Sequence, residues 1–303
     1  MNQQRIGSSG GAGPSNYDET EEAMSGDGGD WVITVDPPLE RKNRRGRTTT
    51  DIRPASPFNK QLIILIVDDS TSMSWHSKAE FATKTAREVI NLCDRKSKQG
   101  LACFDIAIYA YGQMIHYSPE HILRPVNEID PENLQFEGNS GKTDMAIALW
   151  CARFLLDTYD EQYYQKHKAP TEVPAPLIFL LSDGYDNPSA RNKGFHPPKH
   201  YADEIKNMQL PIGLPPMLAT VGIEAGQGRE TIPHEMLKDL ASKSSDGRPA
   251  YFEMSDLNLM VELIATTSSS FISSTDDLID RADEIRKNWE NPFGNDPRLE
   301  GPE

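Results

Sequence analysis

Three short polar segments contain oxygen ligands of the kind that bind a hard divalent cation. The run at 68–72 reads Asp-Asp-Ser-Thr-Ser, the run at 141–144 reads Gly-Lys-Thr-Asp, and the run at 182–184 reads Ser-Asp-Gly. Two carboxylates that lie close together, such as Asp68 and Asp183, repel each other unless a proton or a cation intervenes. Carboxylate and hydroxyl oxygens suit Mg²⁺ or Mn²⁺. None of these segments contains His or Cys, which disfavours zinc.

The elements around these segments predict that they meet at one place. Residues 62–67 are continuously apolar, which indicates a strand buried on both faces, and residues 177–181 form a second apolar strand. Two of the polar segments directly follow these strands. Because the carboxyl ends of parallel strands share one edge of a sheet, we expect Asp68 and Asp183 to converge there.

The rest of the folded region alternates strands with helices. Ser77 precedes Glu80 by three residues, which predicts a capping box at the start of the first helix. Apolar spacing predicts further strands at 104–111, 217–223 and 250–253. It predicts further helices at 145–156, 201–208, 234–242 and 257–271. This order predicts an α/β fold: a Rossmann-like, doubly wound, mostly parallel sheet with helices on both faces.

The polar residues also resemble a known family. Asp68-x-Ser70-x-Ser72, a distant Thr143 before a helix, and Asp183 before a glycine are similar to the metal-ion-dependent adhesion site (MIDAS) of von Willebrand factor A domains. The resemblance implies hydroxyl ligands from both serines and the threonine, and carboxylates that act directly or through bound water. It also implies a cation, Mg²⁺ or Mn²⁺, with an open position that accepts Glu or Asp from a partner protein.

Each segment also has a purely structural interpretation. The Asp-x-Ser-x-Ser run could cap the following helix, Asp183 could belong to an ordinary turn, and Thr143 could lie in the first turn of a helix. The occurrence of all three in one alternating α/β chain favours the metal site.

Two enzyme classes are alternatives to a binding role. Residues 139–143 resemble the end of a nucleotide-binding P-loop, but Phe136 stands where that pattern needs glycine. The run at 68–71 resembles that of haloacid dehalogenase phosphatases, whose second acid is replaced here by Ser70. The sequence therefore predicts a protein that is not an enzyme, with a nucleotide-binding enzyme and a phosphohydrolase as the alternatives.

His and Cys residues elsewhere in the chain could also bind a metal, but their sequence context does not predict a metal site. His196 and His200 have helical metal-binding spacing, but the two prolines between them predict a loop. Cys93, Cys103 and Cys151 lie in apolar segments and match no zinc or redox spacing, so we expect buried thiols.

Composition narrows the classes of partner. The chain of 303 residues has a net charge of −15, whereas a nucleic-acid binder needs a basic face. The N-terminus has no apolar signal core, and no apolar run is long enough to cross a bilayer. We therefore expect a cytoplasmic protein that binds neither nucleic acid nor membrane.

The sequence divides into three parts. Residues 1–57 form an acidic and then basic tail that we expect to be disordered, and residues 58–274 fit the von Willebrand factor A domain. The threonines at 48–50 follow several arginines and are a candidate kinase target. Residues 275–303 are charged, and helical spacing predicts a helix that docks on the domain or on a partner, through Leu278, Ala282, Ile285 and Trp289.

Within the family, the chain resembles the cytosolic prokaryotic TerY-like proteins of tellurium-resistance and stress systems. The resemblance rests on the Asp68 site, on Leu-Ser-Asp-Gly at 181–184 and on the Thr/Ser-rich end at 266–274. It implies a scaffold in a stress-response or phage-defence system, with a Ser/Thr kinase and a PP2C-type phosphatase as partners. The alternative is a partner of an AAA+ ATPase in protein or cofactor assembly.

Overall fold

The computed structural model describes residues 60–100, 103–113, 115–116, 123–164, 174–184, 186–188, 194–212, 214–223, 234–254, 262–264 and 274–290. The predicted N-terminal tail, the candidate kinase target, most of the helix predicted at 257–271 and the end after 290 lie outside these residues.

One sheet of seven strands occupies the centre of the described part of the chain, in the order β3-β2-β1-β5-β6-β7, with β4 also paired to β2. The pairs β1–β2, β1–β5, β5–β6 and β6–β7 are parallel, while β3 and β4 pair with β2 in the antiparallel sense. The strands are β1 (Lys60–Asp68), β2 (Cys103–Tyr111), β3 (Ile115–His116), β4 (Arg124–Pro125), β5 (Leu177–Ser182), β6 (Met217–Ile223) and β7 (Tyr251–Met254).

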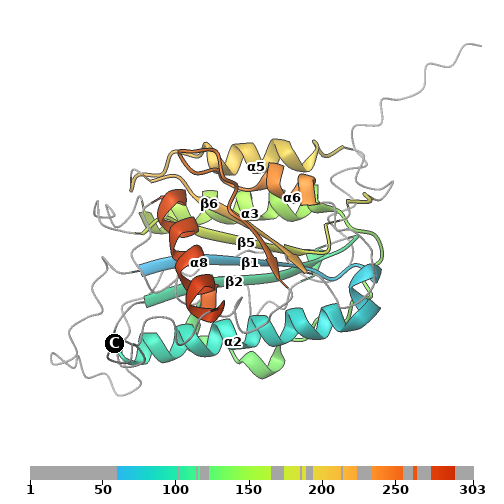
Figure 1. Cartoon of the computed structure of the whole chain (residues 1–303), viewed down its shortest axis with the longest axis horizontal. Helices are drawn as coiled ribbons and strands as arrows, with labels where there is room; N and C mark the ends of the chain where they lie inside the picture. The colour runs from blue at the N-terminus through green and yellow to red at the C-terminus, as the bar shows by residue number, and fades with distance from the viewer. Residues whose placement is uncertain are drawn as a thin grey trace, which may run out of the picture. The chain divides into compact units, whose positions relative to one another are not determined.

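Helices cover both faces of this sheet (Figure 1). Helix α2 lies on one face, and α3, α5 and α6 lie on the other. The α-helices are α2 (Lys78–Lys98), α3 (Met145–Tyr159), α5 (Pro198–Lys206), α6 (His234–Leu240) and α8 (Thr275–Glu290). Shorter helical turns are η2 (Thr71–Ser77), η4 (Val126–Glu128), η5 (Pro131–Asn133) and the π-helical η6 (Asp160–Tyr164). The predicted mostly parallel, doubly wound α/β fold is confirmed.

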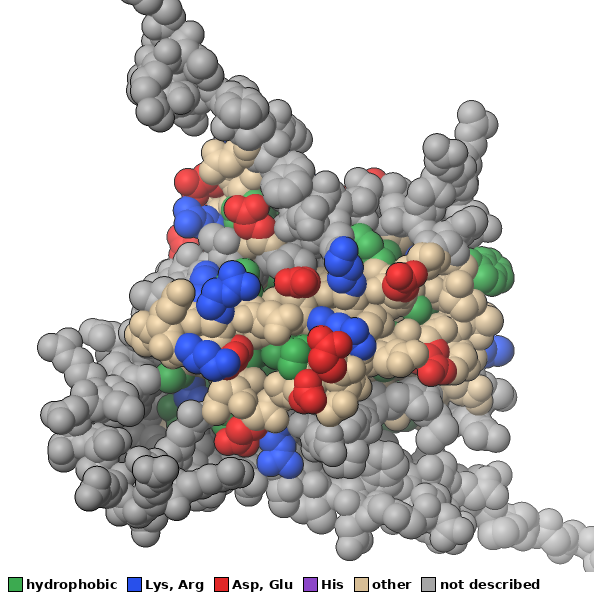
Figure 2. Space-filling view, turned by 90° about the horizontal axis from the view of Figure 1, so that it is seen from below, with side chains coloured by type: hydrophobic (Ala, Val, Ile, Leu, Met, Phe, Trp, Pro, Cys, Tyr) green, Lys and Arg blue, Asp and Glu red, His purple; other side chains and the backbone are tan. Residues whose placement is uncertain are grey.

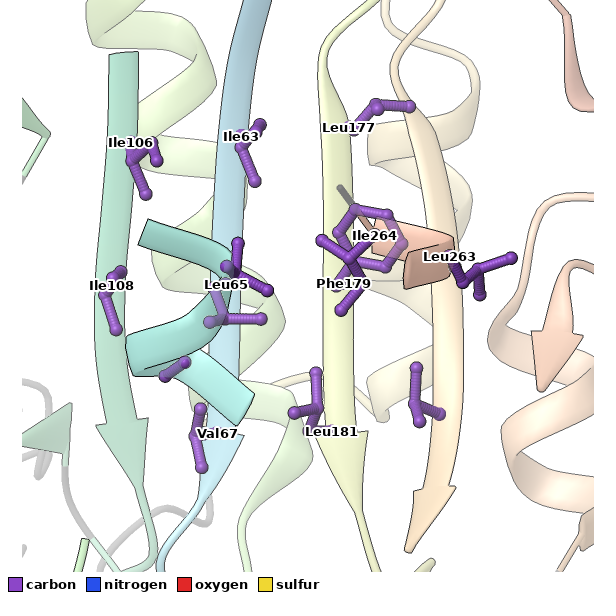
Figure 3. Close-up of a cluster of buried hydrophobic side chains, with 14 of the residues drawn as sticks. Ile63, Leu65, Val67, Ile106, Ile108, Leu177, Phe179, Leu181, Leu263 and Ile264 are labelled. Atoms are coloured by element: carbon purple, nitrogen blue, oxygen red, sulfur yellow. The ribbon is translucent and has the colours of Figure 1, made fainter. Parts of the chain in front are cut away.

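Strand β1 is buried at every position, as its continuous apolar run predicts. Ile63, Leu65 and Val67 belong to the core cluster that includes α2, and they lie beside the side chains of β2 and β5 (Figure 3). The intervening residues point to the opposite face because side chains alternate along a strand. Because β1 has apolar side chains on both faces, both faces of the sheet must be covered by other elements to bury them.

The start of helix α2 differs from the prediction. Ser77 has φ 62° and ψ 21° and makes no side-chain capping hydrogen bond, so the capping box is wrong. The backbone N–H of Lys78 instead donates to the carbonyls of Met73 and Trp75, because η2 runs directly into α2. The buried apolar residues of α2 recur at helical spacing: Ala79, Ala82, Ala86, Val89, Ile90 and Cys93.

Helix α5 begins earlier than its apolar spacing predicts. It starts at Pro198, so the loop predicted around His200 is wrong. Proline is favoured in the first helical turn, where its missing N–H would have no helical partner. The ring centroids of His196 and His200 lie 4.2 Å apart, and His200 Nε2 is 3.4 Å from a carboxylate oxygen of Glu204.

Helix α8 packs on the domain rather than standing apart from it. Its apolar residues join the core cluster on the α2 side: Leu278, Ile279, Ala282 and Ile285. Arg248 extends from the loop before β7 to Asp280 and Asp283, each at 3.1 Å. The predicted helix is confirmed, and it docks on the domain.

The three thiols are not equally buried. Cys93 and Cys151 are buried, which raises the pKa of each to about 12. Cys103 is only half-buried, because it is the first residue of β2, so the prediction of a buried thiol is wrong there. Cys93 and Cys151 are free thiols.

The surface on the α2 side mixes both signs of charge. In Figure 2, which views the molecule from below, Lys and Arg side chains are interspersed with Asp and Glu among the described residues. Within the residues described, no helix combines the length and the apolar character needed to span a membrane.

Candidate metal centre

The candidate site lies where the strand order reverses. From β1 the chain passes to β2 on one side and later returns to β5 on the other side of β1. The carboxyl ends of β1 and β5 therefore flank a topological switch point, the usual position of ligand sites in such sheets. Asp68 ends β1, and Asp183 directly follows β5.

Asp68 is fully buried and joined to both neighbouring strands. Its Oδ1 accepts a hydrogen bond from the backbone N–H of Ser70 at 2.9 Å. Its Oδ2 accepts hydrogen bonds from the hydroxyls of Ser182 at 2.8 Å and Tyr111 at 3.5 Å. Tyr111 pairs with Asp68 in the β1–β2 register, and Ser182 ends β5. Both hydroxyl groups extend the site beyond the residues predicted as ligands.

The environment of Asp68 disfavours its charged form. Burial, and to a lesser extent the negative charge of Asp183, raise the pKa of Asp68 to about 7, although hydrogen bonds from Ser70 and Ser182 act in the opposite direction. Burial and the neighbouring Asp68 likewise raise the pKa of Tyr111 well above its ordinary value. A cation at this edge would stabilise the ionised carboxylates.

Asp183 is also buried, and its two oxygens have different surroundings. Its Oδ2 accepts a hydrogen bond from the Lys78 ammonium at 3.2 Å, whereas its Oδ1 has no hydrogen-bond partner. A buried carboxylate oxygen without a partner is costly, which makes it a candidate ligand atom. Sequence reasoning missed Lys78, because it is 105 positions away from Asp183 and belongs to no motif.

The two predicted serine ligands contact each other. Ser70 Oγ and Ser72 Oγ lie 3.0 Å apart; Ser70 is buried and Ser72 is half-buried. Although Ser70 occupies the position before η2, its side chain makes no capping hydrogen bond. Helix capping therefore does not explain these hydroxyl groups.

Thr143 is buried in the loop before α3. Its carbonyl accepts a hydrogen bond of 2.8 Å from the backbone N–H of Asn187, which follows β5. Two residues earlier, the Gly141 carbonyl accepts one of 2.9 Å from the N–H of Thr71, which follows β1. Thr143 precedes the N-cap residue Asp144, so it lies outside the helix. These contacts bring the three predicted segments to the same edge of the sheet.

Asp69 has a structural role that sequence reasoning did not assign. Its Oδ1 accepts hydrogen bonds from the backbone N–H groups of Glu137 at 2.8 Å and Gly138 at 2.6 Å. Its Oδ2 accepts another from the Ser140 hydroxyl at 2.6 Å. Asp69 thus holds the loop that carries Thr143, and only its place beside Asp68 hinted at a role in this site.

Asp186 is a further acidic group at this edge that the prediction did not include. Its Oδ1 accepts a hydrogen bond of 3.0 Å from the backbone N–H of Met145, at the start of α3. Burial raises the pKa of Asp186. Its local partner is therefore a helix N-terminus, where negative charge is favoured.

The P-loop alternative lacks its structural context. A P-loop follows a buried strand, but the chain leading to Gly141 forms η4, η5 and irregular backbone, with no strand in the described residues from 126 to 144. Lys142 is exposed. The loop is instead hydrogen-bonded to the ends of β1 and β5.

The side chains present at this edge fit a hard divalent cation. Within the described residues, no cluster of three or more His, Cys, Asp and Glu side chains is arranged to hold a metal. A site here therefore depends on hydroxyl oxygens as well as on its two buried carboxylates. Its donor atoms are all oxygen, which suits Mg²⁺ or Mn²⁺. The predicted ligands are Asp68, Ser70, Ser72, Thr143 and Asp183, and this ligand set stays a prediction.

No protein-family model and no curated protein matches the sequence. Solved structures with a similar arrangement include the vWF domain of the type V pili tip protein Mfa5 from Porphyromonas gingivalis, with 12% identity and a TM-score of 0.47 over 69% of this chain and 94% of that one. The manganese-loaded TRAP protein of Plasmodium vivax has 16% identity and a TM-score of 0.46 over 71% and 75%.

A third similar structure is proximal thread matrix protein 1 from the mussel byssus with a zinc-occupied MIDAS motif, with 15% identity and a TM-score of 0.42 over 69% of this chain and 47% of that one. The present chain also spans only 30% of the pilus adhesin SpaC from Lactobacillus rhamnosus. At these identities and TM-scores, the similarities assign no function to this chain.

Proposed function

We propose that this edge of the sheet binds one divalent cation, Mg²⁺ or Mn²⁺, and thereby an acidic side chain of a partner protein, without catalysing a reaction. The observation that carries the proposal is the buried pair of Asp68 and Asp183, in which Asp183 Oδ1 has no hydrogen-bond partner. Two acidic groups in one buried place are stable when a cation neutralises them.

Different residues have different roles in the proposed metal site. Asp68 and Asp183 supply negative charge, directly or through bound water, while Ser70, Ser72 and Thr143 supply neutral hydroxyl oxygens. Asp69 holds the loop of Thr143 in place through three hydrogen bonds. When bound, the cation offers an anionic ligand a position with positive charge. A Glu or Asp side chain of a partner suits that position.

Titration of the full-length chain with MnCl₂ in a calorimeter tests the metal site. We expect one Mn²⁺ per chain, and we expect the double variant Ser70→Ala/Ser72→Ala to lose binding while keeping its circular dichroism spectrum. The matched control is Ser74→Ala, which removes an exposed hydroxyl from the same η2 segment. Absence of Mn²⁺ binding to the wild-type chain contradicts the proposal.

Partner binding has its own test. A tagged wild-type chain is expected to retain a protein partner in Mg²⁺ that EDTA releases and that Asp68→Ala does not retain. Equal recovery with and without EDTA contradicts a metal-dependent contact.

The cellular role in this proposal is that of a cytoplasmic scaffold in a stress-response or phage-defence system, with a Ser/Thr kinase and a PP2C-type phosphatase as partners. The support is the sequence resemblance to TerY-like proteins. The alternative is a partner of an AAA+ ATPase in protein or cofactor assembly. Neighbouring genes discriminate between the two, since each role requires its own enzyme partner.

The enzyme alternatives are tested separately. Binding of fluorescent ATP or GTP that Lys142→Ala abolishes would favour a nucleotide enzyme, and turnover of a generic phosphate ester would favour a phosphohydrolase. We expect neither.

A further inference from the structure

Lys78 is a buried cation at the acidic edge of the sheet. Its side chain is only 10% exposed, and its Nζ lies 3.2 Å from Asp183 Oδ2. Lysine is almost never fully buried unless it is paired, because removing an ammonium from water is costly. The first position of α2 thus places a fixed positive charge beside a predicted metal ligand.

The neighbouring acidic residues have other partners. Asp69 accepts hydrogen bonds from the 137–140 loop. Asp144 caps α3, and Asp186 accepts a hydrogen bond from the first residue of that helix. The ion pair of Lys78 is therefore formed with Asp183 and not with these groups.

The contact leaves one oxygen of Asp183 available. Lys78 engages Oδ2, while Oδ1 is buried without a hydrogen-bond partner. The ammonium and a divalent cation can therefore share this carboxylate, one at each oxygen. Lys78 does not need to leave before a cation binds.

The ammonium of Lys78 changes the net charge of the site when a divalent cation is bound. With Asp68 and Asp183 both ionised, a dication alone would make the site neutral. The ammonium of Lys78 leaves one net positive charge there instead. Positive charges repel at this range, so Lys78 opposes binding of the cation, and it favours a subsequent anionic ligand.

We infer that Lys78 is a specificity-determining residue of the proposed metal site, which weakens binding of the cation and strengthens binding of a carboxylate to the loaded site. The inference rests on the proposed function. It differs from a purely positioning role for Lys78. In that case, loss of Lys78 would disorder Asp183 and weaken the binding of the cation and of the carboxylate alike.

Calorimetric titration of the full-length chain with MnCl₂ tests the first half. Lys78→Gln removes the charge but keeps an N–H donor for Asp183, and we expect its Kd for Mn²⁺ to be lower by about tenfold. Lys84→Gln is the matched control, because it removes an exposed charge from the same helix, and its Kd should stay near the wild-type value. Lys78→Arg keeps the positive charge, so its Kd for Mn²⁺ should also stay near the wild-type value.

Water proton relaxation of the Mn²⁺-loaded chain tests the second half, with glutarate as the carboxylate probe. Glutarate that displaces metal-bound water lowers the relaxation rate. We expect the half-saturating glutarate concentration to be higher for Lys78→Gln than for the wild-type chain, and unchanged for Lys84→Gln.

The outcomes separate the inference from the proposal beneath it. Mn²⁺ binding to none of the proteins overturns the proposed function. Binding to the wild-type chain with an equal or higher Kd in Lys78→Gln overturns the inference alone. If the melting curve of Lys78→Gln shows an unfolded protein, Lys78→Met gives the same comparison with an apolar chain of similar volume.

Discussion

The hydroxyl of Ser182 donates a hydrogen bond of 2.8 Å to the buried carboxylate of Asp68, across the point where the strand order of the sheet reverses. The same hydroxyl accepts a hydrogen bond of 3.0 Å from the backbone N–H of Gly184. The last residues of β1 and β5 are thereby held together before any ligand arrives. Such preorganisation lowers the ordering cost of binding.

The elevated pKa of Asp68 predicts how the stability of the metal-free protein depends on pH. The pKa of Asp68 is about 7 in the folded chain and about 3.9 in an unfolded one. Because the folded state binds this proton more tightly, stability is highest below the unfolded pKa and falls as the pH rises towards 7. The expected loss is on the order of a few kcal/mol, since a change of one in pKa corresponds to about 1.4 kcal/mol.

Urea unfolding in EDTA between about pH 5 and pH 8 measures this effect. Asp68→Asn imitates the protonated carboxyl, so we expect it to lose part of the downward slope and to exceed the wild-type stability at the higher pH. Parallel curves for the two proteins would contradict the elevated pKa.

Magnesium or manganese is expected to stabilise the folded chain. A ligand that binds only the folded state adds RT ln(1 + [L]/Kd), which is about 2.7 kcal/mol at a hundredfold excess over Kd. The Tm measured by differential scanning fluorimetry should rise in millimolar Mg²⁺ and return to its initial value in EDTA. The Ser70→Ala/Ser72→Ala chain should show no rise, and an equal rise in both proteins would place the ion elsewhere.

Gly138 is predicted to be essential for the loop that carries Thr143. It has φ +66°, and a Cβ there would lie 2.3 Å from the backbone N of Ser74. Gly138→Ala therefore adds a backbone clash to the strain of a left-handed conformation, and we expect a loss of at least about 3 kcal/mol. Gly100 has φ +70° but open space around it, so Gly100→Ala should lose only about 1 kcal/mol.

Chemical denaturation of both glycine variants separates two costs: the strain of a left-handed backbone and the steric clash of the added methyl group. We also expect Gly138→Ala to bind Mn²⁺ more weakly, because the Gly138 N–H donates to Asp69. Equal losses of stability in the two variants would show that the loop can move away from the added methyl group.

A buried ion pair at the opposite end of the sheet is predicted to affect stability alone. Lys60 Nζ lies 2.5 Å from Asp105 Oδ2, which also accepts a hydrogen bond of 2.8 Å from the Tyr159 hydroxyl. Lys60→Met leaves the carboxylate without its cation and should cost about 3–5 kcal/mol. The double variant Lys60→Met/Asp105→Leu should recover much of that loss.

Urea unfolding of the two single variants and the double variant completes this cycle, and Mn²⁺ calorimetry should give an unchanged Kd for the folded proteins. Additive losses would show that Lys60 and Asp105 are not coupled.

Helix α8 is predicted to be part of the cooperative unit. Leu278 is fully buried in the core cluster on the α2 side. Leu278→Ala should lower the stability of the whole domain by about 2–5 kcal/mol, as expected for a cavity in a packed core. The exposed Lys287→Ala on the same helix should change it by less than about 0.5 kcal/mol. A separate low-temperature transition in Leu278→Ala would indicate that α8 unfolds independently.

The order of residues along the chain specifies most of the fold. The apolar runs at 62–67 and 177–181 can be buried only inside a sheet covered on both faces, and the alternation with helices makes that sheet parallel. A parallel sheet then brings its carboxyl ends to one edge. The sequence alone therefore predicts that Asp68 and Asp183 lie close together.

Tertiary packing decided what local patterns could not. Ser77 has a capping-box sequence, but η2 runs into α2 and supplies its own carbonyls. Pro198 reads as a helix breaker, yet it opens α5. The pairing of Lys78 with Asp183 depends on how α2 packs beside the end of β5. Side-chain partners distant in sequence follow from burial and the need to compensate charge, which exist only once the chain has folded.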